Sequence, residues 1–364
     1  MRTIAPLLRD ALVREFRRQA HGRIAFAPFA HQAETQLASE GWRLTPHVIP
    51  DDAPYEKIRI AVPDRRHPND AHYETRAILP RPDGPAHHVA NLGAYKQGKS
   101  FEIAAHATGY ACLGEGIGAA DVKFIGLEYK TSEHEFNYLA DMLCSSQGLR
   151  LKHRRFLNDP RGGRMYLELK NGATFECMSW TQKESIKGGE SDAYYYTEAY
   201  QLPGIESFTT VAQNLRKRVG LAYWASTCDR PWLKVIHERG HGLDPDWACT
   251  CSVPGWANAF TFDMKSFVRD CPDPTMLVPY ASALPWMMDA ITAIVAERRK
   301  VSGLMTKERF EIAWLGKLGT FAGSVFRYQQ GERTFGPVTH PALFKPKLIE
   351  QYVRELTEGV GHAS

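Results

Sequence analysis

The feature that most constrains this chain is a short motif in which two glycines frame a loop that ends in a lysine and a serine. It reads Gly93, Ala94, Tyr95, Lys96, Gln97, Gly98, Lys99 and Ser100, a full match to the G-x-x-x-x-G-K-[ST] pattern. Gly93 and Gly98 permit a tight backbone path whose N–H groups surround phosphate. Lys99 is expected to reach the β- and γ-phosphates, and Ser100 to ligate Mg²⁺. The motif therefore predicts binding of ATP with Mg²⁺.

The segments on either side of this motif have the character of a strand and a helix. Residues 88–92 form a short, partly apolar run, and residues 101–110 have a helix-like composition. A helix there would place its positive N-terminal end beneath the phosphates. Strand, loop and helix is the order that a phosphate-binding loop requires. The alternative is a chance match in a glycine-containing turn.

Composition and charge restrict the function only modestly. The chain has 364 residues, of which 43% are hydrophobic, and a formal net charge of +4. This length allows one large domain or two smaller ones, and the charge neither requires nor excludes a nucleic-acid partner. No run approaches the roughly 20 apolar residues of a membrane span, and the N-terminal segment does not read as a secretion signal. We therefore expect an intracellular protein without a membrane partner.

The cysteines do not form a familiar metal-binding pattern. The chain has 7 cysteines and no C-x-x-C pair, and only Cys249 and Cys251 lie close together in sequence. No matching second pair accompanies them, so the spacing is not a zinc pattern. Reduced thiols are the expectation.

Beyond the phosphate-binding motif, segments of strand and helix character alternate. Strands are expected near 122–127, 193–197 and 220–226, and a helix over 133–143. Asn171 and Gly172 join two further strand-like runs and give a strong hairpin signal. Alternating strands and helices predict a mainly parallel central sheet flanked by helices, the α/β fold of P-loop NTPases.

The chain is expected to divide into three parts. Residues 1–255 would form the ATPase core with its N-terminal region, and residues 256–330 a small helical subdomain. That subdomain would contain helices near 259–270, 286–300 and 306–316, joined by proline-rich connections, and residues 331–364 would form a tail. Within the core, the segment 45–86 is dense in proline and aspartate, so we expect a long loop or an embellishment.

A second candidate site follows the aromatic run that starts at Tyr194. Thr197 and Glu198 end this run, where a Walker B strand of an ATPase delivers two polar residues beside the phosphates. In additional-strand ATPases the pair is Asp-Glu, of which Asp holds Mg²⁺ through water and Glu polarises the attacking water. Glu198 is in place, whereas Thr197 stands where Asp is expected and brings a hydroxyl without charge. The alternative is a buried aromatic strand that ends in a surface glutamate.

Four groups of residues, in order along the chain, resemble the ATPase part of phage terminase large subunits, the motors that package viral DNA into procapsids. They are residues 29–32, with Gln32 in an aromatic-plus-glutamine adenine motif; the P-loop at 93–100; residues 187–201, with the Walker B strand and Glu198; and residues 224–227, which are similar to the family's coupling motif. The stretches 308–316 and 323–326 resemble the end of the ATPase part. The resemblance spans residues 29 to about 326.

The resemblance implies an additional-strand ATPase that couples ATP hydrolysis to DNA translocation. Gln32 would contact adenine, Glu198 would orient the lytic water, and Ser226 and Thr227 would sense loss of the γ-phosphate. The implied partners are double-stranded DNA held independently of its sequence, the portal and procapsid, and a small terminase subunit. A homo-oligomeric ring is implied for the active state, with a monomer in isolation as the alternative. The implied location is the host cytoplasm.

The chain departs from the family at three places. The family often has an arginine within the P-loop, whereas this loop offers Lys96, which cannot form a bidentate fork. Lys187 occupies the place of a basic residue that in some members reaches the neighbouring subunit's nucleotide, but an ordinary surface lysine fits equally well. The residues after 326 are too few for the family's nuclease domain, so we expect a truncated chain or a separate nuclease.

Three other functions compete with a packaging motor. A superfamily 2 helicase or translocase would carry strand-separation motifs and a second RecA-like lobe, and none is visible after residue 256. A scaffold subunit that binds ATP without hydrolysis is favoured by the missing Walker B aspartate. A metal-dependent nuclease would need a cluster of carboxylates, which the sequence lacks.

Overall fold

The computed structural model describes residues 27–64, 71–112, 118–145, 151–155, 165–182, 190–209, 220–242, 244–258, 260–277 and 305–318, with the single residues 11, 186 and 289. The chain divides into two compact units, Met1–Leu318 and Gly319–Ser364, and every described residue belongs to the first unit. The predictions for Lys187, for a helix near 286–300 and for residues 323–364 lie outside the described residues.

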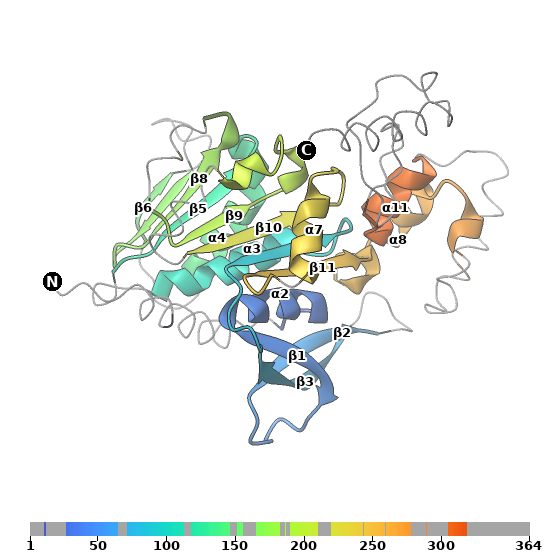
Figure 1. Cartoon of the computed structure of the whole chain (residues 1–364), viewed down its shortest axis with the longest axis horizontal. Helices are drawn as coiled ribbons and strands as arrows, with labels where there is room; N and C mark the ends of the chain where they lie inside the picture. The colour runs from blue at the N-terminus through green and yellow to red at the C-terminus, as the bar shows by residue number, and fades with distance from the viewer. Residues whose placement is uncertain are drawn as a thin grey trace, which may run out of the picture. The chain divides into compact units, whose positions relative to one another are not determined.

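A large sheet organises the described part of the chain (Figure 1), and its strands follow the order β11-β4-β10-β9-β5-β8-β7-β6. The strands from β11 to β8 pair in parallel, and β7 and β6 continue the sheet in antiparallel fashion. The bounds are β4 (His88–Gly93), β5 (Asp121–Gly126), β6 (Leu151–Arg155), β7 (Tyr166–Leu169), β8 (Thr174–Ser179), β9 (Ala193–Tyr196), β10 (Leu221–Ser226) and β11 (Trp247–Val253). The predicted mainly parallel α/β fold is confirmed.

The hairpin between β7 and β8 forms where the sequence signals it. Gly172 lies in the left-handed region with φ of +88°, and its N–H donates to the Leu169 carbonyl at 2.9 Å. Glycine adopts this backbone conformation without the penalty that other residues incur. The antiparallel β7–β8 pair follows from this local turn.

Both faces of the sheet are buried, which explains why its central strands are apolar on consecutive positions. In β9 the side chains of Tyr194 and Tyr196 belong to one core, and Tyr195 belongs to the core on the opposite face. Tyr196 stacks on Trp224 of β10 with ring centroids 3.7 Å apart and an interplanar angle of 3°. Each of these rings is fully buried. The aromatic side chains of β9 therefore contribute to the hydrophobic cores on both faces of the sheet.

Helices cover the two faces. On one face lie α3 (Lys99–Thr108) and α4 (Glu133–Ser145), whose Ile103 and Phe136 pack in the core that contains Tyr195. On the other face lies α7 (Leu233–His241), whose Ile236 packs with Tyr196 (Figure 1). The short 3-10 helices are η1 (Gly109–Cys112), η2 (Tyr129–Ser132), η3 (Trp180–Gln182), η4 (Ala199–Gln201), η5 (Gly255–Ala257) and η6 (Pro274–Leu277).

The expectation of a long loop over 45–86 is wrong for most of that segment. Strands β1 (Trp42–Val48), β2 (Lys57–Pro63) and β3 (Ala71–Pro80) form a separate antiparallel sheet in the order β1-β3-β2. Ile60 and Ile78 of this sheet pack against Ala33 and Leu37 of α2 (Ala30–Glu40). Proline and aspartate masked the strand signal, and the helix that buries the sheet's apolar side chains lies earlier in the chain. The segment is an embellishment that has regular structure.

Two helices after residue 255 build a small core of their own. They are α8 (Met264–Asp270) and α11 (Lys307–Leu315), which correspond to two of the three predicted helices. Phe267, Phe310 and Trp314 are buried together in this core. The Trp314 Nε1 donates to the Asp270 carboxylate at 3.1 Å, so the buried indole N–H is paired.

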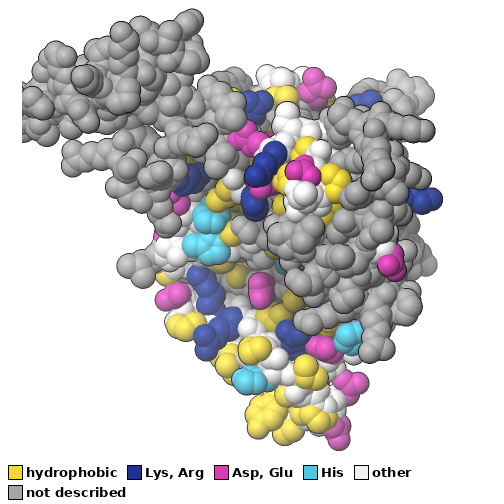
Figure 2. All heavy atoms as spheres, turned by 90° about the vertical axis from the view of Figure 1, so that its right-hand side faces the viewer, with side chains coloured by type: hydrophobic (Ala, Val, Ile, Leu, Met, Phe, Trp, Pro, Cys, Tyr) yellow, Lys and Arg dark blue, Asp and Glu magenta, His cyan; other side chains and the backbone are white. Residues whose placement is uncertain are grey.

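Charges of both signs alternate on one side of the molecule. Figure 2 shows Lys and Arg side chains interspersed with Asp and Glu side chains among the coloured residues of that face. None of the helices that the structure describes combines the length and the apolar character needed to cross a bilayer.

Candidate nucleotide-binding site

The loop between β4 and α3 has the backbone of a phosphate-binding loop. Gly98 precedes α3 with φ of +79°, a left-handed conformation that glycine tolerates. Gly93 is needed for a different reason: a Cβ atom there would meet the Gln97 amide at 2.0 Å. Gln97 is fully buried, and its Nε2 donates to the Val253 carbonyl at the end of β11. The two glycines therefore serve turn geometry and close side-chain packing, respectively.

Two lysines of the loop are placed differently. Lys99 is buried, and its Nζ donates to the carbonyls of Gly93 at 3.2 Å and Ala94 at 2.6 Å. Burial lowers the Lys99 pKa, and the charge of Glu198 opposes this effect. Lys96 is one of two described non-glycine residues with positive φ, at 64°. This left-handed backbone conformation costs free energy for a residue with a Cβ atom, and such residues are concentrated in ligand-binding segments.

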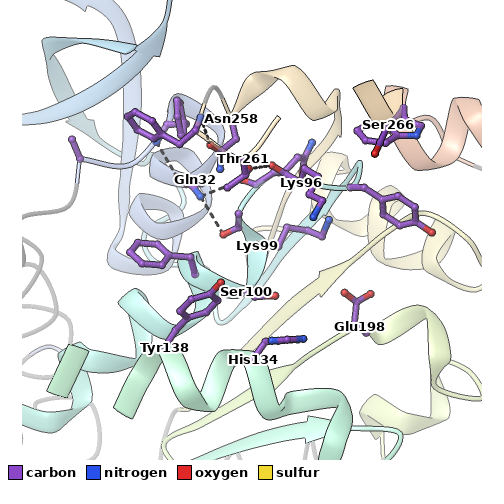
Figure 3. Close-up of a pocket in the computed structure, with 18 of the residues that line it drawn as sticks. Gln32, Lys96, Lys99, Ser100, His134, Tyr138, Glu198, Asn258, Thr261 and Ser266 are labelled. Carbon is purple, nitrogen blue, oxygen red and sulfur yellow. Dashed lines mark hydrogen bonds between the residues drawn. The ribbon is translucent and has the colours of Figure 1, made fainter. Parts of the chain in front are cut away.

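Gln32 links the start of α2 to the phosphate-binding loop. Its Oε1 accepts a hydrogen bond from the Phe29 N–H at 3.0 Å, and its Nε2 donates to the carbonyls of Gln97 at 3.4 Å and Gly98 at 3.3 Å (Figure 3). The side chain is almost completely buried. The predicted adenine contact of Gln32 stays a prediction, and the structure adds that its amide buttresses the loop.

A pocket of about 1020 Å³ opens over this loop. Its lining includes the predicted residues Gln32, Tyr95, Lys96, Gln97, Gly98, Lys99, Ser100 and Glu198. Aromatic side chains gather in the lining as well: Phe29, Tyr73, Phe101, Tyr138 and Phe260. Gly93, Ala94, Thr197, Ser226 and Thr227 do not line it. The pocket thus combines cationic groups and backbone amides, suited to phosphates, with aromatic rings, suited to a base.

Glu198 lies two residues after the end of β9 and has a strained backbone. Its φ is 46° and its ψ is 48°, a left-handed conformation that is uncommon for a residue with a Cβ atom. In Figure 3 its carboxylate points into the space that Lys96 and Lys99 border from the other side. Strain of this kind costs on the order of 1–3 kcal/mol and concentrates at functional sites.

Thr197 faces a different environment from its neighbour Glu198. Its side chain is fully buried, and its hydroxyl lies 2.6 Å from the hydroxyl of Ser132 in η2. Its N–H donates to the Ile125 carbonyl at 3.0 Å. The predicted role of Thr197 at Mg²⁺ stays a prediction, while the structure assigns its hydroxyl a partner within the protein.

Ser226 and Thr227, at the end of β10, connect the Glu198 segment to more distant elements. The Ser226 Oγ accepts a hydrogen bond from the Tyr200 N–H at 2.9 Å, two residues after Glu198. The Thr227 Oγ1 donates to the Asp229 carboxylate at 3.2 Å. Both side chains are buried. The two hydroxyls therefore belong to a hydrogen-bond network beside the pocket and do not line the pocket itself.

Arg309 of α11 extends this connection back to the phosphate-binding loop. Its Nη1 lies 2.7 Å from the Asp229 carboxylate, and its Nη2 donates to the Tyr95 hydroxyl at 2.6 Å. The Tyr95 N–H donates to the Ala313 carbonyl of the same helix at 2.6 Å. A continuous polar chain therefore runs from Thr227 through Asp229 and Arg309 to the loop.

Glu135, in the first turn of α4, is a site residue that the sequence did not reveal. It is buried, and its Oε2 has no hydrogen-bond partner among the described residues. Burial raises the Glu135 pKa to about 7; a hydrogen bond with Ser100 lowers it, and the charge of Glu198 raises it. A second carboxyl group thus touches the predicted metal ligand Ser100. Its position on a helix 35 residues after that serine gave no sequence signal.

Residues beyond β11 also contribute to the pocket without having been predicted. Asn258, Phe260, Thr261 and Arg269 line it, and the Thr261 hydroxyl donates to the Lys96 carbonyl. A Cβ atom at Gly98 would meet the Asn258 Nδ2 at 2.6 Å, so this segment packs directly on the loop. Only the fold brings these residues, about 160 positions later in the chain, to Lys96. Lys187 lies outside the described residues, and its predicted role stays a prediction.

Comparisons with known proteins give structural likeness only. The sequence matches no protein-family model and no curated protein. The structure is similar to the large terminase ATPase domain of Thermus phage P74-26, with 16% identity, a TM-score of 0.41, and coverage of 64% of this chain and 88% of that one. It is also similar to the large terminase of a thermophilic bacteriophage in complex with ATP-gamma-S, with 13% identity, a TM-score of 0.43, and coverage of 67% and 51%. It is similar to the HK97 bacteriophage large terminase as well, with 15% identity, a TM-score of 0.40, and coverage of 50% of this chain and 41% of that one.

Proposed function

We propose that this chain is the ATP-hydrolysing motor of a phage DNA-packaging machine, acting on double-stranded DNA. The observation that carries the proposal is Glu198, which a strained backbone at the end of a central strand holds over a phosphate-binding loop. A loop that only bound nucleotide would have no need for a carboxylate at this position. The terminase-like motifs of the sequence and the parallel sheet support the same function.

A few side chains of the pocket have separate roles in the proposed hydrolysis of ATP. Lys99 and the N–H groups of the loop bind the β- and γ-phosphates, and the approach of negative phosphate draws the Lys99 ammonium from the carbonyls of Gly93 and Ala94. Glu198 accepts a hydrogen bond from the attacking water and orients it toward the γ-phosphate. Lys96 stabilises the charge that develops on the transferred group.

The residues around Ser100 fit a magnesium ion that arrives with ATP. Mg²⁺ prefers oxygen ligands, and the Ser100 hydroxyl lines the pocket with the Glu135 carboxyl hydrogen-bonded to it. The Thr197 hydroxyl, which is paired with Ser132, would act only through a water bound to the ion. An ion held by these residues would supply positive charge that offsets the charge of the phosphates. The unpartnered buried Oε2 of Glu135 supports a contribution from this carboxyl, because Thr197 brings no charge.

The polar chain that starts at Ser226 and Thr227 would transmit the state of the nucleotide. Loss of the γ-phosphate changes the position of Glu198, and the Tyr200 to Ser226 hydrogen bond passes that change to β10. The pairs Thr227–Asp229 and Asp229–Arg309 pass it on to α11. Motion of the helices after residue 255 against the sheet would then move DNA.

DNA and protein partners belong to the proposal as well. A packaging motor must grip any sequence, so its contacts are to phosphates. We assign the portal and procapsid, a small terminase subunit and further copies of this chain in a ring as the remaining partners.

An ATPase assay with and without double-stranded DNA tests the proposal. We expect Mg²⁺-dependent turnover that rises when DNA, and further when DNA with procapsid, is added, and that falls with increasing salt. Binding of a non-hydrolysable ATP analogue without any turnover under all of these conditions would instead identify a scaffold subunit, which Thr197 in place of Asp favours. Strand separation of a tailed duplex would identify a superfamily 2 helicase.

A further inference from the structure

A cluster of histidine and cysteine side chains lies on the sheet face opposite α3 and α4, between α7 and β11. His237 and His241 are separated by one helical turn of α7 and therefore share a face of that helix. Cys249 and Cys251 are two positions apart in β11 and therefore share a face of the strand. The cysteine pair that had no partner in the sequence thus meets a histidine pair in the fold.

The helix approaches the strand closely at this point. A Cβ atom at Gly240 would meet the Cβ of Cys249 at 2.2 Å, so the glycine between the two histidines permits the contact. The ligand atoms of His237, His241 and Cys251 all lie within 4.8 Å of one another. The His241 Nε2 is 2.8 Å from the Cys251 Sγ, and the two imidazole rings have centroids 4.6 Å apart.

We propose that His237, His241 and Cys251 form a zinc site that fastens α7 to β11. Two imidazoles and one thiolate are a typical ligand set for Zn²⁺, which binds nitrogen at about 2.0 Å and sulfur at about 2.3 Å. Tetrahedral geometry with those bond lengths separates nitrogen from sulfur by about 3.6 Å. The His241 Nε2 to Cys251 Sγ distance of 2.8 Å is shorter than this value, and all the ligand atoms lie within 4.8 Å of one another, so the side chains have to separate only slightly around the ion.

An ion can reach these side chains, because His241 is exposed and His237 and Cys251 are partly exposed. The thiolate is the metal-binding form of cysteine. Cys249 or water would complete the coordination.

The position of the site gives the ion a structural role. β11 neighbours β4, and its last residue, Val253, accepts hydrogen bonds from the Ala94 N–H at 3.1 Å and from the Gln97 side chain. Zinc that fixes β11 to α7 would therefore steady the strand against which the phosphate-binding loop rests. This inference does not depend on ATP hydrolysis or on DNA.

Titration of the untagged, metal-stripped chain with Co²⁺ and Zn²⁺ tests the site. We expect one equivalent of Co²⁺ to give the absorption of a tetrahedral ion with a thiolate-to-cobalt charge-transfer band, and one equivalent of Zn²⁺ to displace it. Zinc should also raise the melting temperature of the chain. The intensity of the charge-transfer band scales with the number of thiolates and reports whether Cys249 joins Cys251.

Variants assign the ligands. Cys251→Ser should abolish the charge-transfer band, or halve it where Cys249 is also a ligand, and Cys251→Ser, His237→Ala and His241→Ala should each weaken zinc binding by at least roughly 100-fold, beyond the usual effect of losing an outer-shell partner. His72→Ala and Cys271→Ser, which change a histidine and a cysteine elsewhere in the chain, should bind zinc normally. An octahedral cobalt spectrum without a thiolate band in the unmodified chain, or binding that survives all three ligand substitutions, would overturn the proposal.

Discussion

The hydroxyl oxygens of Thr197 and Ser132 lie 2.6 Å apart in a buried hydrogen bond that joins the segment after β9 to η2. Thr197→Val and Ser132→Ala each leave one hydroxyl unpaired, so each should lower the free energy of unfolding by about 1–2 kcal/mol. If Thr197 also holds a water of Mg²⁺, only Thr197→Val should raise the Mg²⁺ concentration for half-maximal nucleotide binding. Urea denaturation and calorimetry at several Mg²⁺ concentrations measure the two effects. Equal Mg²⁺ dependence in both variants would leave Thr197 a structural residue.

Glu198→Gln tests the orientation of the lytic water. The amide keeps the shape of the side chain, so ATP affinity should stay within a few-fold, while turnover falls by roughly 100-fold or more for lack of a general base. Single-turnover hydrolysis separates chemistry from binding. Glu206→Gln, a change outside the pocket, is the control. Unchanged turnover in Glu198→Gln would remove this residue from the mechanism.

Lys99 and Lys96 should affect different steps. Lys99→Ala removes the buried ammonium that the loop presents to phosphates, so both binding of a non-hydrolysable analogue and turnover should weaken. Lys96→Ala should reduce turnover more than affinity, because a transition-state contact adds little to the ground state. Lys96→Gly serves as the backbone control, since glycine relieves the positive φ of this position. The reverse pattern of affinities would mean that the roles of the two lysines are exchanged.

Glu135→Gln tests the carboxyl group beside Ser100. If Glu135 supplies the negative charge that Thr197 lacks, this variant should need several-fold more Mg²⁺ for nucleotide binding, while binding in the absence of Mg²⁺ stays equal or improves. Glu133→Gln removes a carboxylate from the same turn of α4 and is the matched control. An identical Mg²⁺ requirement for both variants would contradict the assignment.

His88 should make the protein less stable in acid. Burial lowers the His88 pKa from 6.5 to about 4, with a smaller opposing effect of Asp246, so between these values the unfolded chain binds more protons than the folded chain. Stability should therefore be fully present above pH 6.5 and fall as the pH drops toward 4, by at most about 1.4 kcal/mol per pH unit. His31, also buried with a pKa of about 4, adds a slope of the same sign. His88→Gln should flatten the urea-denaturation profile over this range, and a profile as steep as that of the unmodified protein would contradict the prediction.

The phosphate-binding loop was predictable from sequence because its structure is local. The left-handed conformation of Gly98 and the strand and helix beside it follow from neighbouring residues. The same holds for the turn at Gly172, whose φ of +88° favours glycine. Glu198 was predicted as a site residue because it lies just after an apolar strand, two residues beyond Tyr196, and parallel strands deliver their C-terminal residues to one edge of the sheet.

The features of the fold and of the site that the sequence did not predict depend on contacts between segments far apart in the chain. The strands between residues 42 and 80 were missed because the helix that buries their apolar faces contributes no periodicity to them. Glu135 reaches Ser100, and Thr261 reaches Lys96, only through the packing of α4 and of the segment before α8. Likewise, the sequence alone showed only that Cys249 and Cys251 lie two positions apart, whereas the fold placed both on strand β11 and brought His237 and His241 to Cys251. Local patterns encode backbone conformation, but ligand geometry depends on how separate elements pack.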